Sequence, residues 1–513
     1  MPPTTPPLDA PFRPLSDLVR EHAHQQPDHP ALCDAHQTLT YAALDALMDR
    51  VAAALQRDGV RPGEAVALCA LNAVPCAAVF LGALRAGVVV APLAPSSSAE
   101  SLASMLRDAE ARLLFTDQAA QGLAPQGPGA PRCIALDAAA QGQPLDDWLA
   151  PEGARPAPVA VAPAAPFNII YSSGTTGVPK GIVQSHGMRW AHIRRGALFG
   201  YGPQGTTLLA APLYSNTTLV VFFPTLAFGG RVVLMGKFDA ARYLALAQEH
   251  RATHTMLVPV QYQRIMALPQ FGGYDLSAFR FKFCTSAPFH AALKADVLAR
   301  WPGALTEFYG MTEGGGTCIL DAHRHPDKLH TVGQPAEGHD IRLIDEAGRE
   351  VPPGVAGEVV GHSPGMMTGY HNQPGKTREA EWFDATGKRF IRTGDVGRFD
   401  ADGFLILVDR RKDMIISGGF NIYPSDLEAQ LRAHPAVEDV AVVGVPSAQW
   451  GETPVAFVVP RAGQAATPGA VKDWYNQRAG KTQRLADLRF VAELPRSAIG
   501  KVLKRELRDG YAG

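Results

Sequence analysis

A short glycine-rich string carries the residue types needed to wrap a polyphosphate. Residues 171–181 read Tyr-Ser-Ser-Gly-Thr-Thr-Gly-Val-Pro-Lys-Gly, with three glycines, four serine or threonine hydroxyls and one lysine. Glycine lets the backbone approach a ligand closely, and backbone N–H groups and hydroxyls donate hydrogen bonds to phosphate oxygens. The lysine adds a compact positive charge. The string therefore predicts a phosphate-binding loop.

The spacing within this string differs from that of a Walker A loop. A Walker A loop needs Gly-Lys-Ser/Thr after a four-residue gap, whereas Pro179 precedes Lys180 here and Gly181 follows it. A flexible surface loop is the plain alternative, because glycine and serine are common in loops. The mostly apolar residues 167–170 just before the string favour a buried strand that delivers the loop to a fixed place.

Four further strings are polar, flanked by glycine and placed where strands or helices are expected to end. Residues 308–313 (Phe-Tyr-Gly-Met-Thr-Glu) put an aromatic face beside a hydroxyl and a carboxylate. Residues 392–395 (Arg-Thr-Gly-Asp) offer a carboxylate that suits ribose hydroxyls. Residues 417–424 open with Ser-Gly-Gly, and residues 495–501 present one lysine after a glycine. Each string alone is modest evidence for a nucleotide site.

In this order and spacing, the five strings resemble those of the adenylate-forming superfamily of acyl- and aryl-CoA synthetases, peptide-synthetase adenylation domains and luciferases. The resemblance covers residues 15–507. Within the superfamily, residues 408–424 (VDRRKDMIISGGFNIYP) are most similar to acid–CoA ligases of medium-chain, aryl and related acids. The resemblance implies an AMP-forming acid–thiol ligase that uses ATP, Mg²⁺ and coenzyme A.

The implied reaction has two steps. A small carboxylic acid attacks the α-phosphorus of ATP to give acyl-AMP and pyrophosphate. The thiol of coenzyme A then attacks the acyl carbon and AMP leaves. Because an anion must approach a polyanion in the first step, magnesium and lysine are needed to neutralise the phosphates.

The resemblance also implies a role for individual residues of the first step. Lys501 would bridge the α-phosphate and the attacking carboxylate, Thr312 would contact the α-phosphate, and Glu313 would ligate Mg²⁺. Tyr309 would stack on adenine, in a pocket lined by Glu307 and Phe308, and Gly310 would also belong to the nucleotide site. Asp395 and Arg410 would reach the ribose. The residues of the phosphate loop would be Ser172, Ser173, Gly174, Thr175, Thr176, Gly177 and Lys180.

The second step is implied to use the small C-terminal domain. That domain would rotate about Lys412, which swings Lys501 out and brings in the loop Ser417, Gly418 and Gly419. A glycine pair suits a narrow channel for the pantetheine arm, because a side chain there would block it. Trp450 lies where related ligases place a residue near coenzyme A, and simple packing is an equal alternative for it.

The sequence departs from the family pattern beside the expected acyl pocket. Ser215 stands where many relatives have a histidine that contacts the acid, and no aspartate is present nearby to hold an amino-acid ammonium. Asn216 either hydrogen-bonds a hydroxyl of the acid or caps the following helix. The glycine run 314–316 either leaves room for a ring or branched chain, or permits a tight turn. The candidate acid-binding residues are Tyr214, Ser215, Asn216, Thr217, Ser286 and Ala287, with Gly310 and Thr317 beside them.

The elements that must position these residues read as an α/β fold. Strand and helix patterns alternate from residue 15 to about 260, which favours layered α/β subdomains with a largely parallel sheet. Residues 119–166, rich in Ala, Gly, Pro and Gln, read as a long surface connection. Residues 331–407 show short apolar runs between turns, typical of an antiparallel β subdomain. We expect a large N-terminal domain at 1–409 and a small, mobile α+β domain at 410–513.

Composition excludes several other classes of protein. The chain has 513 residues and a formal net charge of −1, so no nucleic-acid footprint is expected. Its six scattered cysteines form no C-x-x-C pair and favour a reducing, cytoplasmic location. No signal peptide and no integral membrane segment are predicted. We expect a monomer or a homodimer.

Two rival functions remain open at this point. The enzyme could load an acyl carrier protein in place of coenzyme A. A degenerate fold that only binds ligands is the non-enzymatic alternative. The polar residues at every motif position argue against it.

Overall fold

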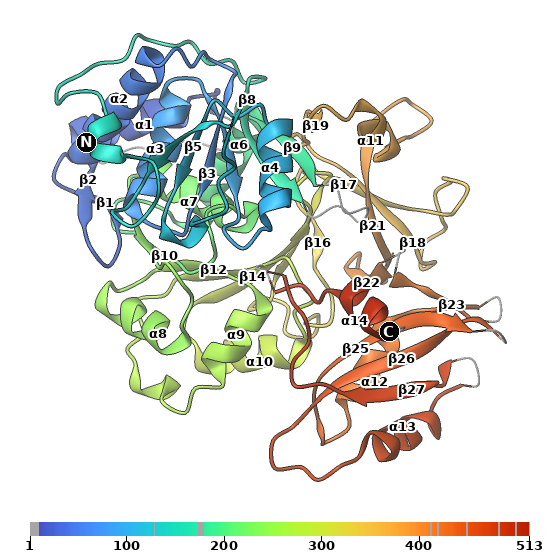
Figure 1. Ribbon diagram of the computed structural model, residues 1–513. Helices are drawn as coiled ribbons and strands as arrows, with labels where there is room; N and C mark the ends of the chain where they lie inside the picture. Colours follow the sequence, from blue (N-terminus) through green and yellow to red (C-terminus); the bar gives the residue numbers. More distant parts are fainter. Residues whose placement is uncertain are drawn as a thin grey trace. The chain divides into compact units, whose positions relative to one another are not determined.

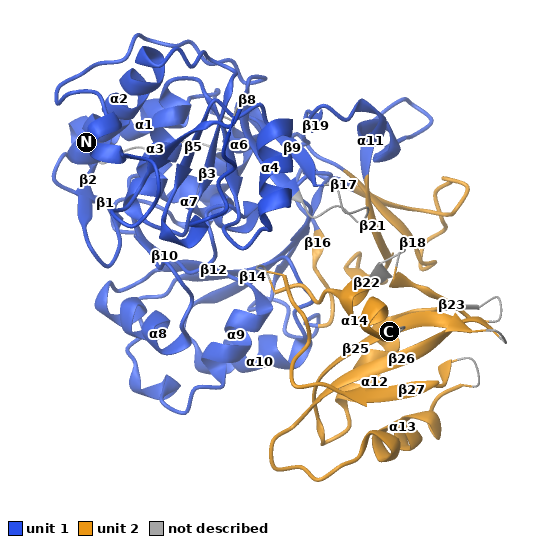
Figure 2. Ribbon diagram, in the orientation of Figure 1, with its two compact units in different colours: residues 1–329, 335–340, 362–391 blue, residues 330–334, 341–361, 392–513 orange. Residues whose placement is uncertain are grey.

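The computed structural model describes residues 10–127, 129–172, 179–410, 413–417, 420–447, 450–480, 483–497 and 500–511 (Figure 1). The chain divides into two compact units (Figure 2). Unit 1 comprises residues 1–329, 335–340 and 362–391, and unit 2 comprises residues 330–334, 341–361 and 392–513. Because the units interleave along the sequence, the expected domain boundary at residues 409 and 410 stays a prediction.

Unit 1 contains an eight-stranded sheet that ends in the strands flanking the phosphate loop. Its core strands run parallel, whereas β9 pairs antiparallel with β8, and β19 with β9. The strand order is β19 (Gly369–Tyr370), β9 (Lys180–Ser185), β8 (Pro166–Ser172), β4 (Val89–Leu93), β3 (Ala65–Cys69), β5 (Leu113–Thr116), β6 (Arg132–Ala135) and β7 (Gln143–Pro144).

A second, nine-stranded sheet carries the string 308–313, along β14 and just after it. Strands β1 and β10 to β14 are parallel, with β2 and β15 antiparallel at its flanks. The order is β16 (Gln334–Pro335), β15 (Thr317–Asp321), β14 (Ala304–Gly310), β13 (Phe281–Cys284), β12 (His254–Leu257), β10 (Thr206–Leu209), β11 (Arg231–Leu234), β1 (Pro30–Cys33) and β2 (Thr38–Thr40).

Helices pack against these two sheets. They are α1 (Leu15–Gln25), α2 (Tyr41–Arg57), α3 (Val74–Arg85), α4 (Ala99–Asp108), α5 (Leu145–Trp148), α6 (His186–Arg195), α7 (Asn216–Ala227), α8 (Ala240–Glu249), α9 (Pro259–Met266), α10 (Ala291–Arg300) and α11 (Pro374–Glu379). Single 3₁₀ turns lie at Gln118–Ala120, Gly196–Phe199 and Phe271–Gly273.

The main core of unit 1 lies between the two sheets. It joins buried residues of α1, α2, α3 and α7 to strands of both sheets, such as Phe167 on β8 and Phe283 on β13. Helix α3 is apolar on every side and is buried all round, as expected for a helix inside a core. Gly82 of α3 lets it approach α2, since a Cβ there would lie 2.5 Å from the Val51 Cβ. The expected layered α/β fold is confirmed.

One expected connection is instead part of the sheet. Residues 119–166 contain β6, β7 and α5, and Ile134 and Trp148 are fully buried. The Trp148 indole N–H donates to Asp58 Oδ2 at 2.7 Å. The prediction of a surface connection was therefore wrong, because a four-residue strand within an Ala- and Gly-rich segment shows too little periodicity to be recognised.

Two smaller sheets complete the fold. One has the order β17 (Asp340–Ile344), β18 (Gly357–His362), β21 (Arg389–Phe399) and β20 (Glu381–Phe383), with β22 (Leu405–Arg410) on β21. The other, within unit 2, has the order β24 (Phe420–Ile422), β23 (Ile415–Ser417), β26 (Gly451–Pro460) and β25 (Val437–Ser447), with β27 (Asp487–Phe490) on β26. Helices α12 (Pro424–Arg432), α13 (Pro468–Asn476) and α14 (Lys504–Tyr511) accompany this last sheet.

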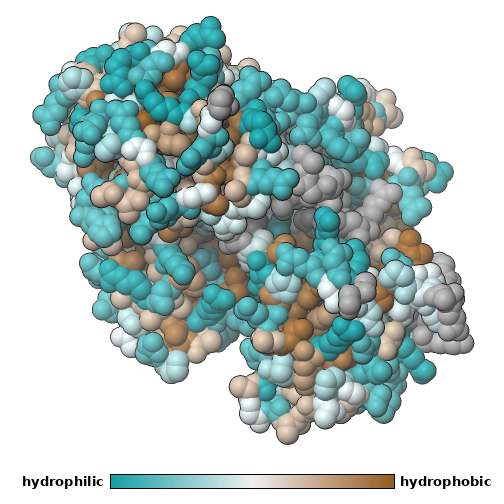
Figure 3. Space-filling model, viewed as in Figure 1, coloured by the Kyte–Doolittle hydropathy of each residue, from teal (hydrophilic) through white to brown (hydrophobic). Residues whose placement is uncertain are grey.

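The surface in view is mostly hydrophilic, with hydrophobic residues distributed among the polar ones (Figure 3). The large hydrophobic side chains that are exposed among the described residues come from separate segments of the chain: Leu198, Val355, Phe383 and Ile416. Within the described part of the chain, no helix combines the length and apolar character that crossing a membrane requires.

Candidate functional site

Strand direction brings the string 308–313 and the two candidate acid-binding segments to one edge of the nine-stranded sheet. Strands β10, β13 and β14 are parallel, so their carboxyl ends lie on the same side. Residues 214–217 follow β10, Ser286 follows β13, and residues 311–313 follow β14. This edge is where open α/β sheets bind their ligands. The Thr217 and Ser286 hydroxyls lie 2.6 Å apart, which confirms that the two segments meet.

The phosphate string lies between the antiparallel strands β8 and β9. Ser172 and Lys180 are cross-strand partners at the open end of this pair. The predicted phosphate-binding residues Ser173, Gly174, Thr175, Thr176 and Gly177 lie outside the described residues. The Lys180 ammonium sits over the Tyr370 ring, 5.0 Å from its centroid.

Tyr370 connects the lysine to the expected magnesium ligand. Its hydroxyl donates to Glu313 Oε1 at 2.8 Å. Burial, together with the Glu313 carboxylate, holds the pKa of Tyr370 above its ordinary value, so the phenol keeps its proton and remains a donor. The structure thus brings Lys180 and Glu313 together around a tyrosine that sequence reasoning missed. Its signal was the Gly-Tyr pair at residues 369–370, a polar string beside glycine like the others.

Glu313 has the right chemistry for magnesium. A carboxylate oxygen is a hard ligand, and Mg²⁺ is usually held by one or two carboxylates, substrate phosphates and water. Among the described residues, no group of three or more His, Cys, Asp or Glu side chains could form a metal site. The backbone of Glu313 is fixed as well, because its carbonyl accepts from Met367 N at 2.8 Å.

Residues 307–309 alternate along β14. Glu307 is 4% exposed and forms an ion pair with Lys294 of α10. The Phe308 ring packs against Phe199 and Phe283, with centroids 5.8 and 5.5 Å away. Successive side chains of a strand point to opposite faces, so Glu307 and Phe308 point to opposite faces of the sheet. The stacking role of Tyr309 stays a prediction.

Asn216 does not cap α7. The helix begins at Asn216 itself, its N-cap residue is Ser215, and no side chain accepts a capping hydrogen bond. The Asn216 Oδ1 atom accepts from Arg189 Nη1 at 2.8 Å and from Gln184 Nε2 at 3.4 Å. The capping interpretation was wrong because the polar cluster behind the helix, formed by residues far away in sequence, holds the amide instead.

Unit 2 holds the remaining predicted residues. Asp395 on β21 is the cross-strand partner of Arg410 on β22, so the two residues expected at the ribose are neighbours. Ser417 is the partner of Gly451, the residue after Trp450. The predicted residues Lys412, Gly418 and Gly419 lie outside the described residues.

Lys501 of unit 2 forms two hydrogen bonds with Ser497 through its backbone. Its N–H donates to Ser497 Oγ at 3.2 Å, and Ser497 N donates to the Lys501 carbonyl at 2.8 Å. Arg496 donates to the Gly500 carbonyl at 2.7 Å and pairs with Asp439 at 2.5 Å. The turn that presents the lysine is therefore anchored to β25.

Comparisons with known proteins match this arrangement. Residues 19–371 fit the family model described as AMP-binding enzyme, and residues 426–501 fit the AMP-binding enzyme C-terminal domain. The chain belongs to the AMP-binding enzyme family. It is 34% identical to a feruloyl-CoA synthase of an Amycolatopsis species, across 95% of this chain and 97% of that protein.

Two further members of the family share nearly the full length. The fatty acid–[acyl-carrier-protein] ligase ScoC of Streptomyces coeruleorubidus is 31% identical over 96% of this chain and 95% of that protein. The ATP-bound structure of MatB from Rhodopseudomonas palustris is 30% identical, with a TM-score of 0.85 over 97% of this chain and 99% of that one. The prediction of an AMP-forming acid–thiol ligase that uses ATP, Mg²⁺ and coenzyme A is confirmed.

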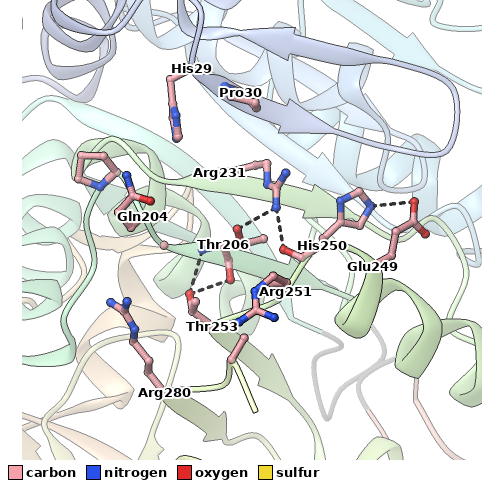
Figure 4. A pocket seen from close by; sticks show the side chains of 13 residues that line it. His29, Pro30, Gln204, Thr206, Arg231, Glu249, His250, Arg251, Thr253 and Arg280 are labelled. Carbon is pink, nitrogen blue, oxygen red and sulfur yellow. Dashed lines mark hydrogen bonds and ion pairs between the residues drawn. The ribbon is translucent and has the colours of Figure 1, made fainter. Parts of the chain in front are cut away.

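A separate pocket of about 470 Å³ lies away from this site (Figure 4). Thr206, Arg231 and Arg280 line it, at or next to the amino ends of β10, β11 and β13. The Arg231 guanidinium, drawn near the centre of Figure 4, donates to Thr206 Oγ1 at 3.1 Å and to the His250 carbonyl at 2.7 Å. Residues 214–217 and Ser286 follow the opposite, carboxyl ends of β10 and β13.

Proposed function

We propose that this AMP-binding enzyme activates an aryl acid that carries a neutral polar substituent and transfers it to coenzyme A. The choice of acid rests on the hydroxyl pair of Thr217 and Ser286. The two hydroxyls lie 2.6 Å apart at the carboxyl ends of β10 and β13. Such a pair can donate to and accept from an uncharged oxygen of a substrate.

Ser286 supports the proposal through its backbone. Its φ of +83° is in the left-handed region, which residues other than glycine rarely adopt. Strain of this kind costs about 1–3 kcal/mol and gathers at functional sites. Residues 214–217 and 284–287 contain no carboxylate, so these two segments provide no ionic partner for an ammonium group of a substrate. The feruloyl-CoA synthase relative adds support, because ferulate carries a ring with hydroxyl and methoxy oxygens.

We propose the following roles in the first step. Lys180 and the loop before it hold the β- and γ-phosphates, and Glu313, oriented by Tyr370, holds Mg²⁺, which offsets phosphate charge when bound. Thr312 contacts the α-phosphate, and Lys501 stabilises the charge that develops between carboxylate and phosphorus. Tyr309, Asp395 and Arg410 position the adenosine.

We propose that the second step uses residues of unit 2. Ser417, Gly418 and Gly419 line the pantetheine path, with Trp450 beside coenzyme A. The pairing of Ser417 with Gly451 supports a common location for Ser417 and Trp450. Rotation about Lys412 within a C-terminal domain at 410–513 would exchange Lys501 for this loop.

We propose a cytoplasmic enzyme that is a monomer or a homodimer. All six cysteines are free thiols, which suits a reducing compartment. Size-exclusion chromatography with light scattering would determine the assembly.

An acid panel tests the proposed substrate class. Ferulate, 4-coumarate, unsubstituted cinnamate and C4–C12 fatty acids would be compared by acid-dependent pyrophosphate release. We expect oxygen-substituted aryl acids to give the highest kcat/KM. Highest values for fatty acids would contradict the proposal.

A matched pair of variants tests the hydroxyl pair. Thr217→Val is expected to raise KM for the substituted acids about 3–10-fold, the equivalent of about 0.6–1.4 kcal/mol for one hydrogen bond, and to leave cinnamate unchanged. Thr218→Val is the control, because its buried hydroxyl has no hydrogen-bond partner in the described structure. An equal effect of Thr217→Val on cinnamate would remove Thr217 from substrate recognition.

A further inference from the structure

Arg189 of α6 is an arginine buried inside unit 1. Its side chain is 1% exposed. The guanidinium lies over the rings of Phe167 and Phe223, at 5.8 and 5.5 Å from their centroids. Burial lowers the pKa of Arg189 to about 9, so the group is still charged at neutral pH.

The hydrogen-bond acceptors of this guanidinium, in the described structure, are three side-chain amides. Nε donates to Asn168 Oδ1 at 3.0 Å, Nη1 donates to Asn216 Oδ1 at 2.8 Å, and Nη2 donates to Gln184 Oε1. A guanidinium has donors and no acceptor. Each amide must therefore turn its oxygen toward Arg189 and its NH₂ group away.

The orientation of Gln184 determines its contact with the turn that contains Thr312. Its Nε2 donates to the carbonyl of Thr312 at 2.7 Å, while its Oε1 also accepts from Asn168 Nδ2 at 3.0 Å. Asn216, held by the same guanidinium, is the first residue of α7. One buried cation thus links β8, β9 and α6 to the segment after β14 and to the start of α7.

The buried arginine and its amides stabilise the fold less than an apolar core of the same volume would. A buried charge without a carboxylate partner is unfavourable, and apolar side chains could fill the same volume. Arg189 holds each amide in a single orientation, because a fully hydrogen-bonded network in a low-dielectric interior is rigid.

We propose that Arg189 is a positioning residue for the adenylation step, acting through Gln184 on Thr312 and through Asn216 on α7. It fixes the position of the turn at Thr312 relative to helix α7. This inference rests on the proposed roles of Thr312 and the α7 segment. Small misplacements of reacting groups are costly, because about 1 Å of displacement can reduce the rate about 100-fold.

Gln184→Glu is the most discriminating variant. The new carboxylate would still accept from Arg189 and would give it an ionic partner, but it has no N–H for the Thr312 carbonyl. We expect an unchanged or higher Tm together with a fall of about 10-fold or more in single-turnover acyl-AMP formation. Thiolation of supplied acyl-AMP is expected to change by less than about 3-fold.

Two arginine variants separate positioning from packing. Arg189→Lys keeps the charge but cannot hold three amides, so we expect reduced acyl-AMP formation by the folded enzyme. Arg85→Lys is the control: Arg85 is also buried, but it pairs with Asp45 and Asp49 at 2.5 and 2.9 Å. We expect Arg85→Lys to lower Tm and to leave adenylation by the folded enzyme unchanged.

Two results would overturn the inference. One is acyl-AMP formation at the wild-type rate in Gln184→Glu. The other is a loss in both half-reactions that follows Tm as it does in Arg85→Lys. All variants are compared with the wild type on the acid that it adenylates fastest. The wild-type rate reports on the proposed function, and the ratio of variant to wild type reports on Arg189.

Discussion

At the scale of single residues, Glu307 has a partner in space that the sequence did not indicate. Its position before Phe308 and Tyr309 suggested an adenine pocket, which stays a prediction, and in the structure its carboxylate pairs with Lys294 of α10. Burial raises the pKa of Glu307 to about 7, although the Lys294 charge lowers it. The sequence could not reveal this pair, because Lys294 comes from a helix and its partner from the next strand.

The ion pair predicts a pH-dependent loss of stability in Lys294→Met. Removing one partner of a buried pair costs about 3–5 kcal/mol. Because the folded-state pKa is above the ordinary value of 4.5, the carboxylate form costs stability as pH rises through 4.5 to 7. We therefore expect a larger fall in Tm at pH 8 than at pH 5.5. Equal losses at both pH values, or a pH dependence that survives in Lys294→Met/Glu307→Gln, would contradict this account.

At the scale of elements, periodic patterns predicted the fold well and local composition did not. Residues 41–57 have an apolar face that follows the helical period, and they form α2, Tyr41–Arg57. Strands β6 and β7 were missed because they are too short for a pattern. The segments after the parallel strands β10, β13 and β14 share one edge by topology alone. The amides around Arg189 needed tertiary structure, since Asn168, Gln184 and Asn216 come from three elements.

The turn after β14 gives an element-scale prediction. Gly314 has φ +72°, and a Cβ there would lie 2.0 Å from the Gly365 carbonyl oxygen. The turn is also held by Ser363 Oγ, which donates to the Gly314 carbonyl at 2.6 Å. We expect Gly314→Ala to push Glu313 out of place and to lower kcat for pyrophosphate exchange about 10–100-fold.

Gly338→Ala is the matched control for this turn. Its φ is +75°, but nothing lies within 4 Å of an added Cβ. Both variants pay the backbone cost of about 1 kcal/mol, and only Gly314→Ala adds the clash. Similar kcat values for the two variants would show that close packing of the turn is unimportant for catalysis.

At the scale of the whole molecule, the proposed chemistry needs residues of both compact units. Lys501 belongs to unit 2, and Lys180 and Glu313 belong to unit 1. Family membership confirms the class of reaction, and the assignment of each step to these residues stays a prediction. The identity of the acid was less accessible from sequence, because hydroxyls such as those of Thr217 and Ser286 become a binding feature only once folding pairs them.

Lys501→Ala tests the proposed division directly. We expect acyl-AMP formation to fall about 100-fold or more, since one charge that stabilises the transition state is lost. Thiolation of supplied acyl-AMP is expected to remain. Lys504→Ala is the control, because that lysine pairs with Glu428 at 2.8 Å and has no proposed role in the first step. Adenylation at the full rate in Lys501→Ala would contradict the mechanism.

The central claim is that this AMP-binding enzyme converts an oxygen-substituted aryl acid to its coenzyme A thioester through acyl-AMP. Quantifying AMP, pyrophosphate and thioester by liquid chromatography and mass spectrometry, with ferulate, ATP and Mg²⁺ across a coenzyme A titration, tests it most directly. We predict acyl-AMP without coenzyme A, and equal amounts of AMP and feruloyl-CoA with rapid turnover once it is added. Acyl-AMP that forms but is never turned over faster by coenzyme A, and that is consumed only by an acyl carrier protein, would contradict the claim.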